Sequence, residues 1–121
     1  WYTALHPSAV ISPMETAIGE GSVIMANAVV NPGTQIGRHC ILNTGASVDH
    51  DNRIGDCVHI SVGARTAGTV SIGQRTMLGI GAVVSNNCTV VSDCMIGAGS
   101  VVVRDITEPG IYVGAPVRKV K

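Results

Sequence analysis

Aliphatic residues recur at every sixth position along most of this chain. Starting at Ile18 and stepping by six, fourteen of the fifteen positions through Val102 are aliphatic, and the exception is Thr66. A second series, which starts at Ser22 and is also spaced by six, carries almost only small side chains. Strands repeat every two residues and helices every 3.6, so a sustained period of six indicates a short strand plus a turn, repeated as one unit.

This pattern predicts a parallel β-helix with a triangular cross-section. Three six-residue units form one coil, and glycine marks this longer period at Gly19, Gly37, Gly55 and Gly73, which are spaced by 18. Successive coils would pair along flat parallel strands about 4.8 Å apart, so that positions one coil apart in sequence stack on one another. We therefore expect an all-β fold of about five coils. A narrow interior also explains why a chain that is 45% hydrophobic contains no Phe.

The repeat divides the 121 residues into three segments of one domain. Residues 1–17 hold a weaker form of the repeat, with a slip of one residue before Ile18, and we expect them to form an N-terminal cap. Residues 18–104 form the β-helix, and a turn cluster then leads into a closing cap over residues 105–121. A cap is expected at each end because uncovered strand edges would template aggregation.

Composition argues against several classes of partner. Eight basic and eight acidic residues give a formal net charge of zero, and no basic run provides a footprint for nucleic acid. The apolar stretches are too short for a membrane span, and no charged-then-apolar leader opens the chain. We expect a soluble, cytoplasmic protein without membrane insertion.

The four cysteines are interpreted as packing residues. Cys40, Cys88 and Cys94 lie on the small-residue series, where a thiol behaves as a compact buried hydrophobe, and Cys57 lies off it. No CxxC pair is present, so neither a zinc site nor a disulfide framework is indicated.

His50 is the strongest candidate for a catalytic group. It is flanked by Asp49 and Asp51, immediately after Val48 of the aliphatic series. A carboxylate beside an imidazole fixes its tautomer and stabilises the imidazolium that forms when the ring accepts a proton. The arrangement therefore suits a general base, while the alternative is a solvated turn rich in polar residues.

Stacking places Gly68 beside His50, because it follows one full coil later in the chain. Gly68 also falls in the one repeat where Thr66 replaces the aliphatic residue. A glycine at this corner lets a ligand approach the backbone, and its amide can serve as an oxyanion donor.

A second group of residues lies on other parts of the predicted coils. His59 is half a coil from His50, so the two would meet only across an interface between copies of the chain, and its alternative role is that of a hydrogen-bonded interface residue. Gly79 and Gly97 are one coil apart and should stack into a shallow groove. That groove suits a thin ligand such as a pantetheine arm, although glycine is also common at such corners for turn geometry alone.

Five segments together resemble the C-terminal half of bacterial sugar acetyltransferases, a group within the hexapeptide-repeat acyltransferases that includes sialic acid O-acetyltransferases and bacillosamine-pathway N-acetyltransferases. The segments that carry the resemblance are residues 42–45, 48–51, 59–64, 67–68 and 113–116.

The resemblance implies a left-handed β-helix that assembles into a homotrimer, with acetyl-CoA bound between neighbouring chains and no metal. It implies that His50 deprotonates the acceptor, that Asp51 activates His50, and that the amide of Gly68 faces the thioester oxygen. His59, Ile80 and Ala98 would contact acetyl-CoA, with Gly79 and Gly97 in the groove beside them, and Asn43 and Asp49 would lie near the acceptor.

Two features depart from the family pattern. Members usually carry an N-terminal nucleotide-binding domain that grips a sugar nucleotide, and this chain shows no counterpart, which leaves the acceptor open. Asp51 also stands where some members have the longer glutamate.

The expected function is acetyl-CoA-dependent acetylation of an amino or hydroxyl group on a sugar or sugar nucleotide. The alternative from another class is a non-catalytic trimeric scaffold or remnant. A metal-dependent carbonic anhydrase on the same architecture would need three imidazoles around zinc, and only His50 and His59 are suitably placed here.

Overall fold

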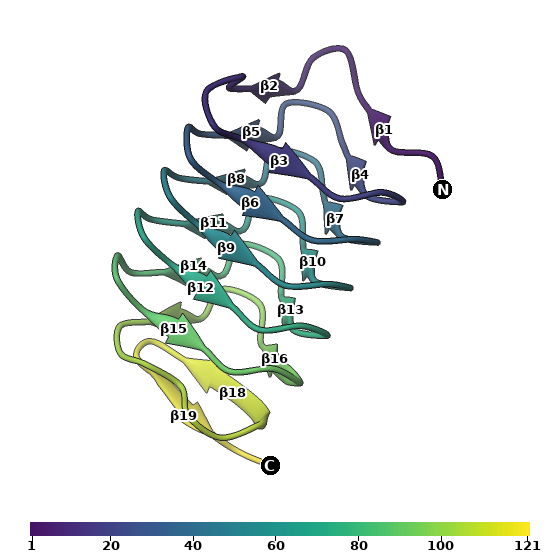
Figure 1. Cartoon of the computed structure of the whole chain (residues 1–121). Helices are drawn as coiled ribbons and strands as arrows, with labels where there is room; N and C mark the ends of the chain where they lie inside the picture. The colour runs from purple at the N-terminus through teal and green to yellow at the C-terminus, as the bar shows by residue number, and fades with distance from the viewer.

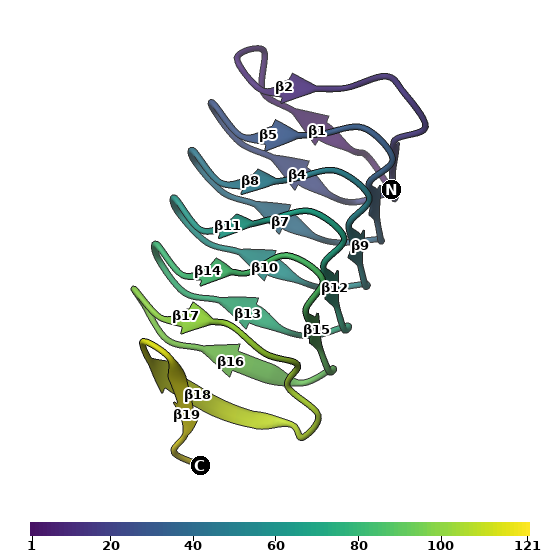
Figure 2. The ribbon, with the colours of Figure 1, turned by 90° about the vertical axis from the view of Figure 1, so that its left-hand side faces the viewer.

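The chain winds through nineteen short β-strands and contains no helix. In the computed structural model, which describes residues 1–121, the strands build a stack of triangular coils with the N-terminus at one end and the C-terminus at the other (Figure 1). Each side of the triangle is one sheet, and up to β17 the neighbours within a sheet are strands three apart in sequence (Figure 2). The all-β parallel helix predicted from the six-residue period is confirmed.

Three sheets, named A, B and C, form the sides of the prism. Sheet A contains β1 (Ala4–Leu5), β4 (Val23–Ile24), β7 (Ile41–Leu42), β10 (His59–Ile60), β13 (Met77–Leu78), β16 (Cys94–Ile96), β18 (Gly110–Gly114) and β19 (Val117–Lys119). Sheet B contains β2 (Val10–Ile11), β5 (Val29–Val30), β8 (Ser47–Val48), β11 (Arg65–Thr66), β14 (Val83–Val84) and β17 (Val101–Val102). Sheet C contains β3 (Ala17–Ile18), β6 (Gln35–Ile36), β9 (Arg53–Ile54), β12 (Ser71–Ile72) and β15 (Thr89–Val90).

The register repeats once per coil through the body of the helix. Ile60 pairs with Leu42 on one side and with Leu78 on the other, and the other strands follow the same spacing. The slip expected near the start is visible, because Ala4 pairs with Val23 at an offset of 19 whereas Ala17 pairs with Gln35 at 18. Strands β1 and β2 therefore already stack on the coil that follows them.

The core is a column of aliphatic side chains inside the prism. Every position of the aliphatic series from Ile24 to Val102 is buried, and so is every position of the small-residue series from Ser22 to Ser100. Cys40, Cys88 and Cys94 are buried free thiols, as the sequence predicted, whereas Cys57 is exposed. Two residues per strand suffice because the first points outward and the second points into the column.

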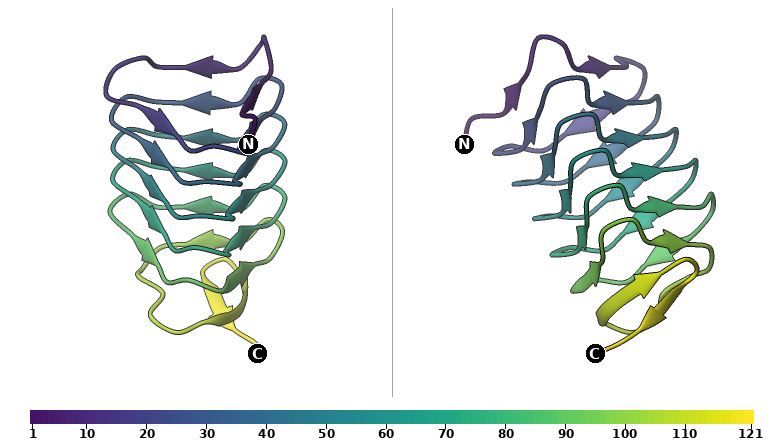
Figure 3. Two further views of the ribbon diagram at one scale, coloured as in Figure 1. Left: turned by 45° about the vertical axis from the view of Figure 1, so that its right-hand side comes forward. Right: turned by 180° about the vertical axis from the view of Figure 1, so that it is seen from behind.

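The C-terminal segment ends the stack with a different strand arrangement. Ile106 forms a parallel bridge to Val90 on sheet C. Strand β18 then pairs in parallel with β16, and β19 turns back antiparallel to it (Figure 3). No helix in the structure is long and apolar enough to span a membrane.

The turns between the sheets line up into three edges of the prism. The AB edge follows the sheet-A strands and includes residues 43–45, 79–81 and 97–99; the BC edge follows the sheet-B strands and includes residues 49–51 and 67–69. Most turns contain a residue with positive φ, which is glycine along most of the AB edge and a non-glycine residue such as Asp51 (φ 55°) at most corners of the BC edge. Aspartate is one of the few side chains that tolerate this conformation.

Candidate active site

His50 and Asp51 form an exposed pair on the BC edge, in the turn between β8 and β9. Nδ1 of His50 lies 3.0 Å from Oδ2 of Asp51. The carboxylate accepts a hydrogen bond from Nδ1–H, which places the proton on that nitrogen and leaves the Nε2 lone pair free. The pair therefore has the arrangement of a general base with its orienting carboxylate.

The imidazole of His50 lies over Gly68, one coil further along the same edge. A Cβ atom on residue 68 would overlap Nε2 and Cε1 of His50. The N–H of Gly68 donates no hydrogen bond within the chain, as at several other corners, and is free for a ligand. The structure thus brings together His50, Asp51 and Gly68, the three residues predicted as catalytic.

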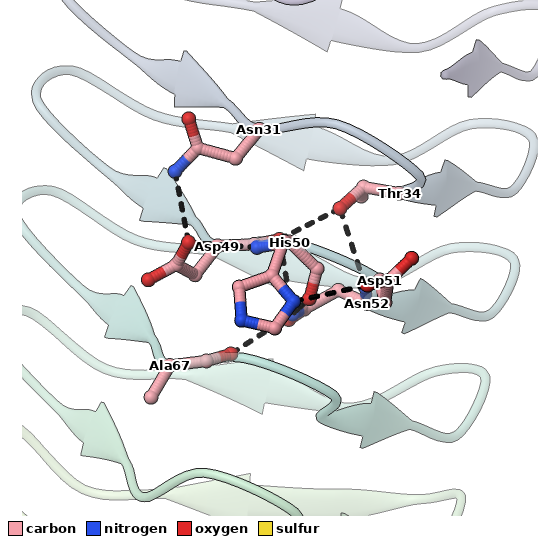
Figure 4. A network of polar contacts seen from close by, with 7 residues as sticks. All are labelled: Asn31, Thr34, Asp49, His50, Asp51, Asn52 and Ala67. Carbon is pink, nitrogen blue, oxygen red and sulfur yellow. Dashed lines mark hydrogen bonds and ion pairs between the residues drawn. The ribbon is translucent and has the colours of Figure 1, made fainter. Parts of the chain in front are cut away.

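Asp49 is held in place beside His50 by two donors. Its Oδ1 atom accepts from Nδ2 of Asn31, at 3.1 Å, and from the backbone N–H of His50, at 2.8 Å. Its Oδ2 atom has no hydrogen-bond partner in the chain and remains available to a ligand. Figure 4 shows Asn31, Asp49 and Ala67 on three successive coils of this edge. The residues predicted from the sequence did not include Asn31, although its position one coil before Asp49 indicates that the two side chains lie close together.

Buried polar side chains lie directly beneath the His50 turn. Asn52 is fully buried, and its Nδ2 atom donates to the carbonyl oxygens of Asp49, His50 and Ala67 at 3.1, 3.1 and 2.9 Å. Its Oδ1 atom accepts a hydrogen bond from the hydroxyl of Thr66, the residue that interrupts the aliphatic series. The sequence showed that Thr66 interrupts the aliphatic series, but it did not indicate that Asn52 is the hydrogen-bond partner of Thr66.

The residues predicted to contact acetyl-CoA lie on a different edge of the prism. His59 is on the outer face of sheet A, and Gly79, Ile80, Gly97 and Ala98 are in the AB-edge turns that follow β13 and β16. Ile80 is 61% exposed. Within one chain this group and the His50 group therefore lie apart, on different edges of the prism.

Asn43 lies beside His59 rather than beside Asp49. Its Oδ1 atom accepts the N–H of Thr44 at 2.7 Å, which leaves Nδ2 to face Nε2 of His59 at 3.3 Å. Because Nδ2 can only donate, Nε2 of His59 accepts, and the proton of this ring is on Nδ1. Nδ1–H is then the group that His59 can offer to a ligand.

No enclosed cleft surrounds His50 in the single chain. The His50 and Asp51 side chains are 57% and 65% exposed. A hollow of about 580 Å³ lies instead among residues 103–119 near the C-terminus. No group of three or more His, Cys, Asp or Glu side chains is arranged to hold a metal ion.

Comparisons with known proteins identify the type of repeat. Residues 15–50 match the family model described as bacterial transferase hexapeptide (six repeats). A search of curated proteins found no significant match.

Solved structures match nearly the whole chain. The acetyltransferase domain of PglB from Neisseria gonorrhoeae FA1090 is 41% identical over 98% of this chain, with a TM-score of 0.95, and has also been solved with acetyl coenzyme A. Perosamine N-acetyltransferase from Caulobacter crescentus, in complex with CoA and GDP-perosamine, is 42% identical over 99% of this chain, with a TM-score of 0.96. This chain covers 57% of the length of each of these two relatives. The chain thus carries hexapeptide repeats of the bacterial transferase type, and it resembles the bacterial sugar acetyltransferases over nearly all of its length.

Proposed function

We propose that this chain is the β-helical part of an acetyl-CoA-dependent acetyltransferase that acts on an amino group of a sugar or sugar nucleotide. The placement of His50 carries the proposal. With Nδ1–H donated to Asp51, Nε2 is the ring nitrogen left to accept a proton, and it lies next to the free amide of Gly68 on the BC edge. A base and an oxyanion donor side by side are the two groups that acyl transfer needs.

The residues suggest a direct transfer. Nε2 of His50 removes a proton from the acceptor as the acceptor nitrogen attacks the thioester carbonyl carbon. The negative charge that develops on the carbonyl oxygen is stabilised by the N–H of Gly68. When the C–S bond breaks, the sulfur of CoA takes the proton from the imidazolium, and His50 returns to its starting state.

Asp49 favours an amine over a hydroxyl as the acceptor. Its Oδ1 atom is already paired with Asn31 and His50, whereas Oδ2 is free beside the base. An amine can donate one N–H to this carboxylate oxygen while His50 removes a proton from the same nitrogen, whereas a hydroxyl has only a single proton to give. The Caulobacter relative, described as a perosamine N-acetyltransferase, supports the same choice.

Acetyl-CoA would bind along the AB edge of a neighbouring copy, and three copies would complete the sites. The outer face of sheet A carries an apolar stripe in which Ile41 and Met95 are 39% and 48% exposed. The outer face of sheet C carries Gln35, Arg53, Ser71 and Thr89 instead. An apolar flat face beside a polar one favours sheet A as the contact between copies. That contact would bring the AB edge of one copy towards the BC edge of another.

The proposal is tested by calorimetry with acetyl-CoA and by acetyl-transfer assays on paired acceptors. We expect acetyl-CoA to bind, and a nucleotide-linked amino sugar to be acetylated faster than the same sugar with a hydroxyl in place of the amine. Sedimentation should give a trimer. Absence of acetyl-CoA binding would favour a scaffold, and faster transfer to the hydroxyl sugar would overturn the choice of acceptor.

A further inference from the structure

We propose that Asn52 and Thr66 are positioning residues for the reaction, and that together with Thr34 they form a buried polar bracket that fixes His50 against Gly68. This inference rests on the proposed function, since it concerns the same corner. The bracket is defined by these three residues, all of which are buried, with Thr66 no more than 4% exposed.

The amide of Asn52 joins two successive coils. Its Nδ2 atom donates to the carbonyls of Asp49 and His50 in one turn and to the carbonyl of Ala67 in the next. Ala67 immediately precedes Gly68, and its carbonyl oxygen has no other hydrogen-bond partner in the chain. One side chain thus links the backbone that carries the base to the backbone that carries the oxyanion donor (Figure 4).

Thr66 fixes the orientation of this amide, and Thr34 holds the backbone on both sides of the His50 turn. The hydroxyl of Thr66 donates to Oδ1 of Asn52, which directs Nδ2 towards the three carbonyls. The hydroxyl of Thr34 donates to the carbonyl of Asp49 at 2.7 Å and accepts the backbone N–H of Asn52 at 3.2 Å. Because no buried side-chain nitrogen or oxygen is left unpaired, the bracket is fully satisfied.

Packing alone does not explain these residues. Thr66 stacks between Val48 and Val84, so a valine would fit the column at this position. Val70 occupies the place of Asn52 one coil later and is fully buried there. An apolar pair would therefore satisfy the core, and the polar pair occurs only in the coil that joins His50 to Gly68.

Other buried residues of the small-residue series that carry a hydroxyl or a thiol make simpler contacts. Ser22, Cys40 and Thr76 each donate to the carbonyl 15 residues ahead, at Gly37, Gly55 and Val91. Asn52 makes the equivalent bond to Ala67, and its amide also donates to the carbonyls of Asp49 and His50 in the turn that holds His50, with one N–H shared between acceptors. These additional bonds determine where the base lies, and a displacement of about 1 Å can cost a factor of ~10² in rate.

The test compares Thr66→Val with Thr66→Ser and with the matched control Thr76→Val. Thr66→Val removes the donor to Asn52, and we expect kcat to fall at least about tenfold while KM for acetyl-CoA changes less than about twofold. Thr66→Ser keeps the hydroxyl and should recover most of the lost kcat. Thr76→Val also removes a buried hydroxyl with two hydrogen bonds, but it lies away from His50 and should leave kcat unchanged.

The double variant Asn52→Val/Thr66→Val separates positioning from stability. The double variant makes the interior of this coil apolar, like that of the next coil, so it should unfold at no lower temperature than Thr66→Val. Its kcat should nevertheless be as low as that of Thr66→Val. A double variant that regained both stability and kcat would show that the bracket only stabilises the fold, and would overturn the proposal.

An NMR measurement on the imidazole of His50 tests the inference without an activity assay. In the wild-type protein the imidazole ¹⁵N chemical shifts of His50 should report a single tautomer with the proton on Nδ1, and in the double variant an average of tautomers. If the wild-type protein transfers no acetyl group, the proposed function fails while this measurement still tests the bracket. Unchanged His50 shifts in both Thr66→Val and the double variant would refute it.

Discussion

The imidazole of His50 lies directly on the Cα of Gly68, in the space that a side chain at residue 68 would fill. The two residues occupy the same edge on neighbouring coils, linked by the hydrogen bond from Thr69 N–H to the carbonyl of His50. Gly68 therefore has a second role besides offering its amide. Because it has no side chain, it leaves room for the imidazole of His50.

Replacing Gly68 with alanine should displace the base without unfolding the chain. Gly68 does not have a positive φ, so alanine is not strained by its backbone conformation, and its methyl group would conflict mainly with the His50 ring. The ring is exposed and can swing away, so we expect a small loss of stability and a loss of kcat on the order of 10²-fold. Kinetics together with thermal unfolding check this.

The control for this substitution is the same change in a chain without the imidazole. In the His50→Ala background, Gly68→Ala should cost no further stability, because the methyl group then meets no ring. A full additional loss of stability would show that the conflict lies with the backbone.

His50→Ala should remove most acetyl transfer and leave the fold intact. The side chain is exposed, and its hydrogen bond to the exposed Asp51 carboxylate contributes little to stability. Loss of a general base costs roughly 10² to 10⁴ in rate. Steady-state kinetics, with sedimentation to follow the oligomer, measure both effects. The control is His39→Ala, which removes an exposed histidine on the edge between sheets C and A and should keep wild-type turnover. If His50→Ala had a turnover comparable to that of His39→Ala, His50 would not be the base.

Stacking explains why so much of the fold was predictable from the sequence. A period of six fixes the strand and turn, and a period of three such units fixes which residues lie above one another. The juxtaposition of His50 and Gly68 follows from these two periods alone, as does the burial of Cys40, Cys88 and Cys94. In a β-helix, as in other folds built from repeats of fixed length, sequence separation predicts directly which residues stack on one another.

The hydrogen-bonded details could not be predicted in the same way. The period places Asn52 inside the prism, but its three bonds depend on the orientation of one amide, which Thr66 sets from the next coil. The period also does not determine how copies of the chain would pack against one another. That relationship depends on the surfaces in contact between copies, which the repeat leaves free to vary.

Ile80→Ala should weaken acetyl-CoA binding without affecting the fold. Ile80 is 61% exposed, so its removal should change the free energy of unfolding by no more than about 0.5 kcal/mol. If the side chain covers the ligand, losing the buried area should raise KM for acetyl-CoA about tenfold with little change in kcat. The control is Val10→Ala, which trims a similarly exposed residue on sheet B. Equal KM values for both variants would argue against an acetyl-CoA site on the AB edge.

Stability should decline at alkaline pH because three thiols are buried. Burial raises the pKa of Cys40, Cys88 and Cys94 above the ordinary thiol value. Their protons are therefore held more tightly in the folded chain than in the unfolded chain, where a thiol ionises near pH 8.5. The contribution is fully present below about pH 8.5 and is lost as the pH rises from there through the higher folded pKa values.

The measurement is the unfolding temperature between neutral pH and about pH 10.5, under reducing conditions, for the wild-type protein and for the triple variant Cys40→Ala/Cys88→Ala/Cys94→Ala. Alanine is suitable because Ala28, Ala46, Ala64 and Ala82 occupy equivalent buried positions. The variant starts from a lower stability at neutral pH, since it loses buried sulfur, but its unfolding temperature should fall less steeply above pH 8.5. Parallel curves would mean that the thiols do not cause the alkaline loss, because the two proteins differ only at these three positions.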